Sequence, residues 1–199
     1  VCVSEWLNIF NAVFVFISDM IVSAVPNKVN IMALLVHTEK HRPCQVFISY
    51  RRKGGDILAN RVANYLMDRG YVVFLDIDAM HSGDFNTQIF TAIEQCTDFL
   101  LILSPNALDA CSEEDDWVRK ELSLALTQGK RIIPIMKDFT FPDSLPPEIN
   151  AVRDQEGVNV PADYIDFALK RIEGYLKSNR SIFRVLLRRI NKELTTAPK

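Results

Sequence analysis

The amino-acid sequence predicts an α/β fold in which helices cover both faces of a five-stranded parallel sheet. Four apolar runs of four or five residues recur between residues 46 and 136, and segments with helical periodicity separate them. Parallel strands that are buried on both faces form continuous apolar runs of this kind, and a helical crossover joins each to the next. With 199 residues, the chain has room for one such domain and for further segments beside it.

The first half of the domain begins with a strand, a helix and a second strand. Residues 46–49 form an apolar run, and residues 54–69 carry apolar side chains at helical spacing. Gly70 marks the end of that helix, because glycine readily adopts the left-handed conformation found just after a helix. Residues 71–75 are β-branched and aromatic, which favours a second strand.

The alternation of helices and strands continues to the end of the domain. The further predicted elements are a helix capped by Asp84, a strand at 99–103, a helix at 117–127, a strand at 132–136, a weaker strand at 157–160 and a helix that opens at Pro161. This order predicts a flavodoxin-like sheet. Ligands of such sheets bind outside the carboxyl ends of the strands.

The composition divides the chain into three parts. We expect residues 1–44 to be an N-terminal apolar segment with a linker, residues 45–177 the domain, and residues 178–199 a basic amphipathic helix. Residues 6–25 carry one charge and are long enough to anchor the chain in a membrane, with the domain on the cytoplasmic side. An amphipathic or partner-facing helix and a leader segment are the alternatives for this run.

The C-terminal segment is basic, whereas the domain is acidic. The whole chain has a formal charge of −2, but residues 45–176 sum to about −8 and residues 177–199 to about +6. We therefore expect no nucleic-acid partner. The tail either packs on a domain or binds acidic lipid or a partner protein. Its basic side chains recur every four residues, at Arg180, Arg184, Arg188 and Lys192.

The cysteines and histidines give no metal-binding pattern. The four cysteines form no CxxC pair and no cluster with the three histidines. We expect no metal site, and we expect the thiols to stay reduced. The cysteines are Cys2, Cys44, Cys96 and Cys111.

Two short motifs carry the main functional signal. The first apolar run ends directly in an aromatic ring and two guanidinium groups, those of Tyr50, Arg51 and Arg52. Trp117 and Glu121 stand four residues apart, and hence on one face of a helix. Cations and a ring at a strand end, with a carboxylate held beside an indole, predict a pocket for an anionic nucleotide.

Residues at the predicted strand ends exclude two common functions of this fold. A phospho-receiver domain needs acidic residues near the first strand and an aspartate at the end of the third. This chain has arginines at 51–52 and Ser-Pro at 104–105. A flavodoxin needs a phosphate loop rich in serine and threonine after the first strand, but residues 53–56 are Lys-Gly-Gly-Asp.

Residues 45 to about 177, some two-thirds of the chain, resemble the TIR domain family. Within that family they are most similar to the NAD-cleaving TIR domains of the animal sterile-alpha-and-TIR-motif proteins. The matching positions are residues 47–52, 74–76, Gly83, Phe85, 103–109, 116–122 and 132–135.

The resemblance implies cleavage of NAD+ at the nicotinamide–ribose bond, giving linear or cyclic ADP-ribose in immune or cell-death signalling. NAD+ is then the substrate, and no cofactor is implied. Glu121 matches the catalytic glutamate, and one of the two arginines is expected to face the ligand while the other forms a structural salt bridge. The positions that match substrate-binding residues are Tyr50, Arg51, Arg52, Asp76, Phe85, Trp117 and Phe141.

The resemblance also implies a loop at residues 77–86 that gates the site and docks neighbouring TIR domains. Asp78, His81 and Gly83 are the loop and assembly residues. The chain departs from its relatives at His81, Ala79 and Phe141, where they carry a glutamate, a lysine and a tryptophan. The alternative function is a non-catalytic TIR adaptor that signals only through TIR–TIR contact.

Overall fold

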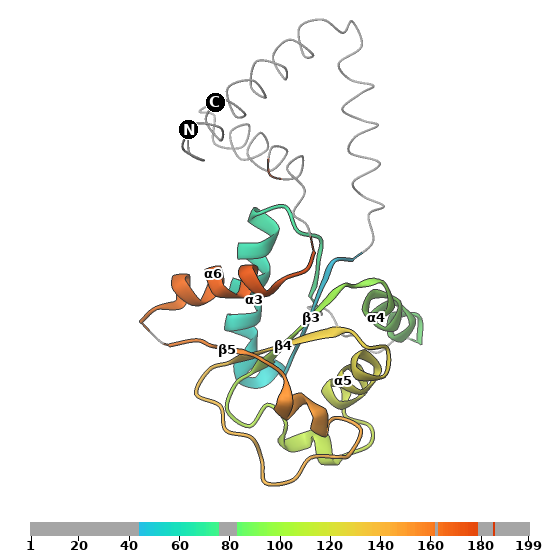
Figure 1. Ribbon diagram of the computed structural model, residues 1–199. Helices are drawn as coiled ribbons and strands as arrows, with labels where there is room; N and C mark the ends of the chain where they lie inside the picture. The colour runs from blue at the N-terminus through green and yellow to red at the C-terminus, as the bar shows by residue number, and fades with distance from the viewer. Residues whose placement is uncertain (1–43, 76–82, 162, 179–184, 186–199) are drawn as a thin grey trace, which may run out of the picture. The chain divides into compact units, whose positions relative to one another are not determined.

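The computed structural model describes residues 44–75, 83–161, 163–178 and 185, except for the side chains of residues 83–86. It confirms the predicted α/β fold, with five strands in the order β2-β1-β3-β4-β5 and parallel pairing throughout (Figure 1). The elements are β1 (Val46–Tyr50), α3 (Arg52–Asp68), β2 (Val73–Leu75), α4 (Gly83–Gln95), β3 (Asp98–Leu103), a 3-10 turn (Asp109–Ser112), α5 (Trp117–Thr127), β4 (Arg131–Met136), a second 3-10 turn (Asn150–Asp154), β5 (Val158–Asn159) and α6 (Ile165–Tyr175).

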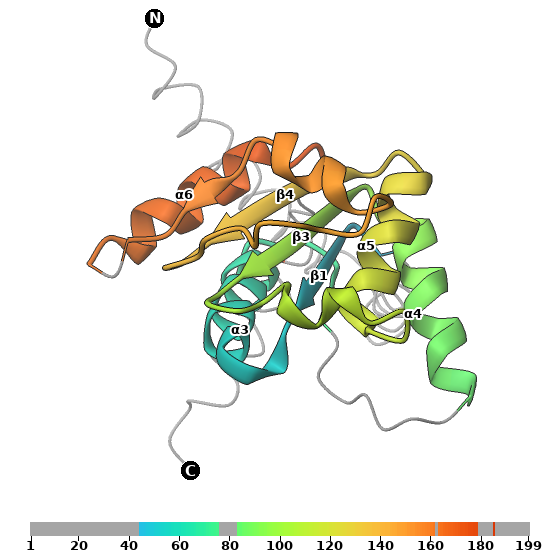
Figure 2. The ribbon, with the colours of Figure 1, turned by 90° about the horizontal axis from the view of Figure 1, so that it is seen from below.

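The sheet lies between two helical layers, with α3 and α6 on one face and α4 and α5 on the other (Figure 2). Successive side chains of a strand point to opposite faces. In β1, Val46 and Ile48 face α3 and α6, whereas Phe47 faces α4 and α5. The same alternation directs Ser49 toward α5 and Tyr50 toward α3.

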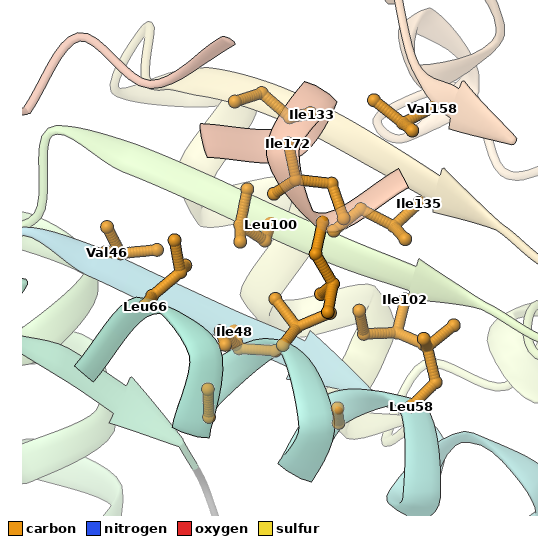
Figure 3. Close-up of a cluster of buried hydrophobic side chains, with 14 of the residues drawn as sticks. Val46, Ile48, Leu58, Leu66, Leu100, Ile102, Ile133, Ile135, Val158 and Ile172 are labelled. Carbon is orange, nitrogen blue, oxygen red and sulfur yellow. The ribbon is translucent and has the colours of Figure 1, made fainter. Parts of the chain in front are cut away.

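Each layer has its own core cluster. On the α3 side, aliphatic side chains of four strands, β1, β3, β4 and β5, meet Leu58 and Leu66 of α3 and Ile172 of α6 (Figure 3). On the α5 side, Phe47 stacks between Phe74 and Phe99, with both ring centroids 5.3 Å from its own. Both clusters pack helices against the sheet. Because the strands are parallel, their carboxyl ends lie together at one end of it.

Asp98 closes the opposite, amino-terminal edge of the sheet. This fully buried carboxylate accepts hydrogen bonds from the backbone N–H groups of Lys177 and Ser178, at distances from 2.9 to 3.1 Å. The Ser178 hydroxyl donates to the same carboxylate at 2.6 Å. The end of the domain is therefore fixed at the end of the sheet away from the carboxyl end of β1, which carries Tyr50, Arg51 and Arg52.

Two predicted boundaries were wrong, and one predicted helix contains a kink. The last helix begins at Ile165 and not at Pro161, because the Val160 N–H still bonds to Met136 and a turn follows. Helix α3 contains a kink, where Gly54 takes a φ of 90° that suits glycine. Helix α4 already starts at Gly83, so the last four residues of the predicted loop 77–86 are helical.

Within the described residues, no helix is long and apolar enough to cross a membrane. The apolar run at 6–25 lies outside the described residues, and so does most of the predicted basic helix at 178–199. Their predicted roles stay predictions.

Candidate active site

Helix α5 is positioned by Asp116, the residue just before it. Its Oδ1 accepts a hydrogen bond of 2.9 Å from the backbone N–H of Arg119, which makes Asp116 the N-cap of the helix. Such a side-chain cap satisfies a donor that the first turn leaves without an intrahelical partner, and it stabilises a helix by about 1 kcal/mol. The cap determines that α5 starts at Trp117.

Arg51 holds the same carboxylate from the end of β1. Its two terminal nitrogens reach the two Asp116 oxygens at 2.5 and 3.0 Å, and its Nε donates to the Ala107 carbonyl at 3.1 Å. Two-pronged pairing of this kind is directional as well as strong. It joins the carboxyl end of β1 to the start of α5 and to the chain that follows β3.

The environment of Asp116 favours its charged form. Burial by itself would raise the pKa of this carboxyl, but the bonds from Arg51 and from the Arg119 N–H outweigh it and lower the pKa below the usual value. The Cys111 thiol adds a bond to Oδ1 at 3.3 Å. Burial and the neighbouring Asp116 raise the pKa of Cys111 to about 12, so this thiol stays protonated.

Glu121 lies one turn further along α5, in the stripe of the helix that faces the sheet. The other buried side chains of this stripe are apolar: Val118, Leu122 and Ala125. Only 4 % of Glu121 is exposed, which is unusual for a glutamate unless it has partners. One partner is Ser49 of β1, whose hydroxyl donates to Oε2 at 2.6 Å.

Trp117 stands on the same side of α5, one turn before Glu121, and is partly buried. Its ring centroid lies 6.3 Å from that of Phe90 in α4. The Lys120 ammonium lies 5.4 Å from the indole ring and pairs with Asp115 at 2.9 Å. Trp117 and Glu121 therefore lie one turn apart on α5, and the Ser49 bond links Glu121 to the carboxyl end of β1.

A family model for the TIR domain matches residues 46–174. The chain belongs to the TIR domain family. The match confirms the resemblance that the two motifs indicated.

Three relatives show where this TIR domain stands in the family. NAD(+) hydrolase sarm1 of Drosophila melanogaster is 34% identical over 171 residues, 83% of this chain and 13% of the relative. NAD(+) hydrolase tir-1 of Caenorhabditis elegans is 38% identical over 138 residues, 66% of this chain and 14% of the relative. The probable 2' cyclic ADP-D-ribose synthase BdTIR of Brachypodium distachyon is 35% identical over 133 residues, 63% of this chain and 54% of the relative.

The TIR domain places the three residues of the Tyr-Arg-Arg motif in different surroundings. Tyr50 packs against the core on the α3 side, on the other face of the sheet from Ser49 and Glu121. Arg51 forms the ion pair with Asp116, and the side chain of Arg52 is exposed. The structural salt bridge that was expected from one of the arginines is therefore that of Arg51.

Phe141 follows β4 and packs against the core on the α5 side. Its ring meets Phe139 edge-on at 4.9 Å, and the Arg153 guanidinium lies 5.2 Å from its centroid. Asp76, Asp78 and His81 lie outside the described residues, and the side chain of Phe85 in α4 is not described. Substrate binding by these residues stays a prediction.

Two site residues escaped the sequence analysis. Asp116 carries the usual signal of an N-cap, an aspartate just before a helix. Ser49 had a weaker signal, because strand alternation places it on the same face as Phe47, where a polar side chain needs a partner. The structure identifies that partner as Glu121.

A groove of about 580 Å³ runs along the outer side of α5, but neither Glu121 nor Trp117 lines it. Its lining mixes carboxylates with Arg119 and Lys120, so its charge favours no one class of ligand. We take the inner side of α5, where the buried Glu121 lies, as the candidate active site.

Replacing Asp116 by asparagine should lower the free energy of unfolding by about 1–3 kcal/mol at pH 7, because Arg51 loses its buried counter-charge. Because folding lowers the pKa of Asp116, its charge stabilises the fold at pH values above the pKa of the unfolded state, about 3.9. This stabilisation is lost as the pH falls through the pKa of the folded state. The deficit should therefore be constant from about pH 7 to 5 and shrink below about pH 4.

Urea unfolding of both proteins across this pH range measures the effect. Asp115→Asn is the control, because the Asp115 carboxylate pairs with Lys120 but is fully exposed, and little change is expected. A deficit that is the same at every pH would contradict the role given to the Asp116 charge.

Proposed function

We propose that this TIR domain cleaves NAD+ at the nicotinamide–ribose bond, with Glu121 as the catalytic residue. The observation that carries the proposal is the burial of the Glu121 carboxylate in a helical stripe that is otherwise apolar. Burying a charged group costs free energy, so a helix that served packing alone would gain from an apolar residue there. The names of the related animal hydrolases support NAD+ as the substrate.

The proposed reaction suits a single carboxylate. Breakage of the N-glycosidic bond leaves positive charge on the ribose while nicotinamide departs as a neutral molecule. A carboxylate beside the anomeric carbon or the ribose hydroxyls stabilises that charge, as in glycosidases. Water then adds to the anomeric carbon and releases a proton, giving ADP-ribose. Attack by another group of the same ADP-ribose gives a cyclic product, the kind named for the Brachypodium relative.

The neighbouring groups supply binding and no further chemistry. Trp117 offers a flat ring for the nicotinamide, one helical turn from Glu121. Because nicotinamide in NAD+ already carries a positive charge, it is a good leaving group without any oxidant. We therefore propose that NAD+ is consumed as a substrate and that no cofactor takes part. We also propose that the domain is cytoplasmic and that its consumption of NAD+ serves immune or cell-death signalling.

Activity should depend on association with other TIR domains. With 4 % of Glu121 exposed, the carboxylate of a single domain is almost closed to a substrate. Contacts between domains that shift the surroundings of the site would open it. The same TIR–TIR contact is the partner interaction that we propose for this chain.

Replacing Glu121 by glutamine should lower the rate of nicotinamide release by about 10² or more, because the neutral amide cannot stabilise the developing cation. The change keeps the shape of the side chain, so the fold should persist. Circular dichroism checks the fold and chromatography of the products checks the rate.

The control for this substitution is Glu114→Gln, because Glu114 is an exposed glutamate just before α5. It should cleave NAD+ like the wild type. A folded Glu121→Gln protein that cleaves NAD+ at the wild-type rate would show that the site is assigned wrongly.

Activity per molecule should rise with protein concentration, and Gly83→Arg should abolish that rise while the domain stays folded. Gly83 is the first residue of α4 and borders the segment proposed for assembly. Proline is unsuitable there, because it is well tolerated at the first position of a helix. Measuring the specific activity across a roughly hundredfold dilution series tests whether activity depends on assembly.

Gly174→Arg is the matched control, because a Cβ at Gly174 on α6 would meet no atom within 4 Å. It should keep the rise in activity. A flat dilution series for the wild type would contradict activation by assembly.

One observation favours the alternative function, a TIR adaptor without enzymatic activity. Arg51 pairs with Asp116, so a domain without enzymatic activity would also keep this arginine. The Tyr-Arg-Arg motif therefore distinguishes enzyme from adaptor less well than its sequence suggested. The distinction rests on Glu121, and the glutamine variant tests it.

A further inference from the structure

The geometry points to a residue that orients the proposed catalytic carboxylate: we propose that Ser49 is a positioning residue for Glu121. The inference rests on the proposed function and extends it to a residue that had no predicted role. Ser49 lies near the carboxyl end of β1, and its side chain faces α5.

Both members of the pair are shielded from water. Ser49 is 1 % exposed and Glu121 4 %. The distance of 2.6 Å between the Ser49 Oγ and the Glu121 Oε2 is in the range of a hydroxyl bonded to a charged carboxylate. In a buried site, such a bond is stronger than on the surface, and its loss leaves an acceptor that water cannot easily satisfy.

The position of the donor explains why it orients Glu121. Ser49 is part of a strand that pairs with β2 and β3, so its backbone is fixed by the sheet. Its side chain is short, with one rotatable bond before the hydroxyl. Glu121 has three such bonds and would otherwise sample several rotamers. The hydroxyl therefore transfers the rigidity of the sheet to a flexible carboxylate.

Orientation of this kind should affect turnover more than substrate binding. A carboxylate that shifts by about 1 Å loses much of its effect on a transition state, whereas the remaining contacts still hold the substrate. Ser49→Ala should thus lower kcat by roughly 10- to 100-fold and change KM by no more than about twofold.

Ser104 supplies a matched control. It is also a buried serine, 2 % exposed, and it follows β3 at the same edge of the sheet. Alternation places it on the α3 side, where its hydroxyl lies 3.6 Å from a Cβ built on Gly54 or Gly55. It has no hydrogen-bond partner among the described residues. Ser104→Ala removes the same atom from the other face, so kcat should stay within about twofold of the wild type.

The experiment compares the full 199-residue wild type with Ser49→Ala, Ser49→Thr, Ser49→Cys and Ser104→Ala, all checked for folding by circular dichroism. Nicotinamide release at several NAD+ concentrations gives kcat and KM. Threonine keeps the hydroxyl and should restore kcat to within about threefold, whereas cysteine is a weak donor and should resemble alanine. The cysteine variant preserves the test if alanine does not fold.

Two negative results are distinct. A wild type that cleaves NAD+ together with a folded Ser49→Ala or Ser49→Cys that keeps its kcat would overturn the positioning role alone. A wild type that releases no nicotinamide would overturn the proposed function, and the role of Ser49 in catalysis with it.

Urea unfolding tests the pair without any enzymatic activity. Ser49→Ala should lower the unfolding midpoint of the wild type, and it should lower that of a Glu121→Met protein by much less, because the acceptor is gone. Equal losses in the two backgrounds would show that the two side chains are not coupled and would overturn the inference.

Discussion

The ion pair between Arg51 and Asp116 is the contact on which the geometry of the site depends. It joins the carboxyl end of β1 to the first turn of α5, and the same carboxylate caps that helix. Once the start of α5 is fixed, the helical period determines where each later side chain lies. Glu121 then falls in the inward stripe, where Ser49 of β1 meets it. Without the Asp116 carboxylate, α5 would lose both its N-cap and the ion pair that joins its first turn to β1.

The elements could be predicted from the sequence where the local signals were strong. The helix at Trp117–Thr127 was predicted with both of its ends, and the signal for its end is Gly129, which has a φ of 62°. The central strands are continuous apolar runs, and their short length favours strands over buried helices. Boundaries failed where local signals compete, as at Pro161, which is compatible with the start of a helix and with the turn that the structure contains.

The site could be predicted only in part, because its decisive contacts join residues far apart in the chain. The Arg51–Asp116 pair spans 65 residues and the Ser49–Glu121 bond 72. Spacing within α5 could place Trp117 and Glu121 on one face, but it could not tell which of two adjacent arginines forms the salt bridge. Nor could it show that Glu121 is buried, since a glutamate on a helix is exposed in most proteins.

The central claim to be tested is that the buried Glu121 carboxylate serves a reaction on NAD+. The most direct test follows NAD+ by proton NMR in the presence of the purified 199-residue chain, at high protein concentration and with a crowding agent. The account predicts that free nicotinamide appears as NAD+ disappears, together with linear or cyclic ADP-ribose. A folded and self-associated protein that leaves NAD+ intact would contradict it.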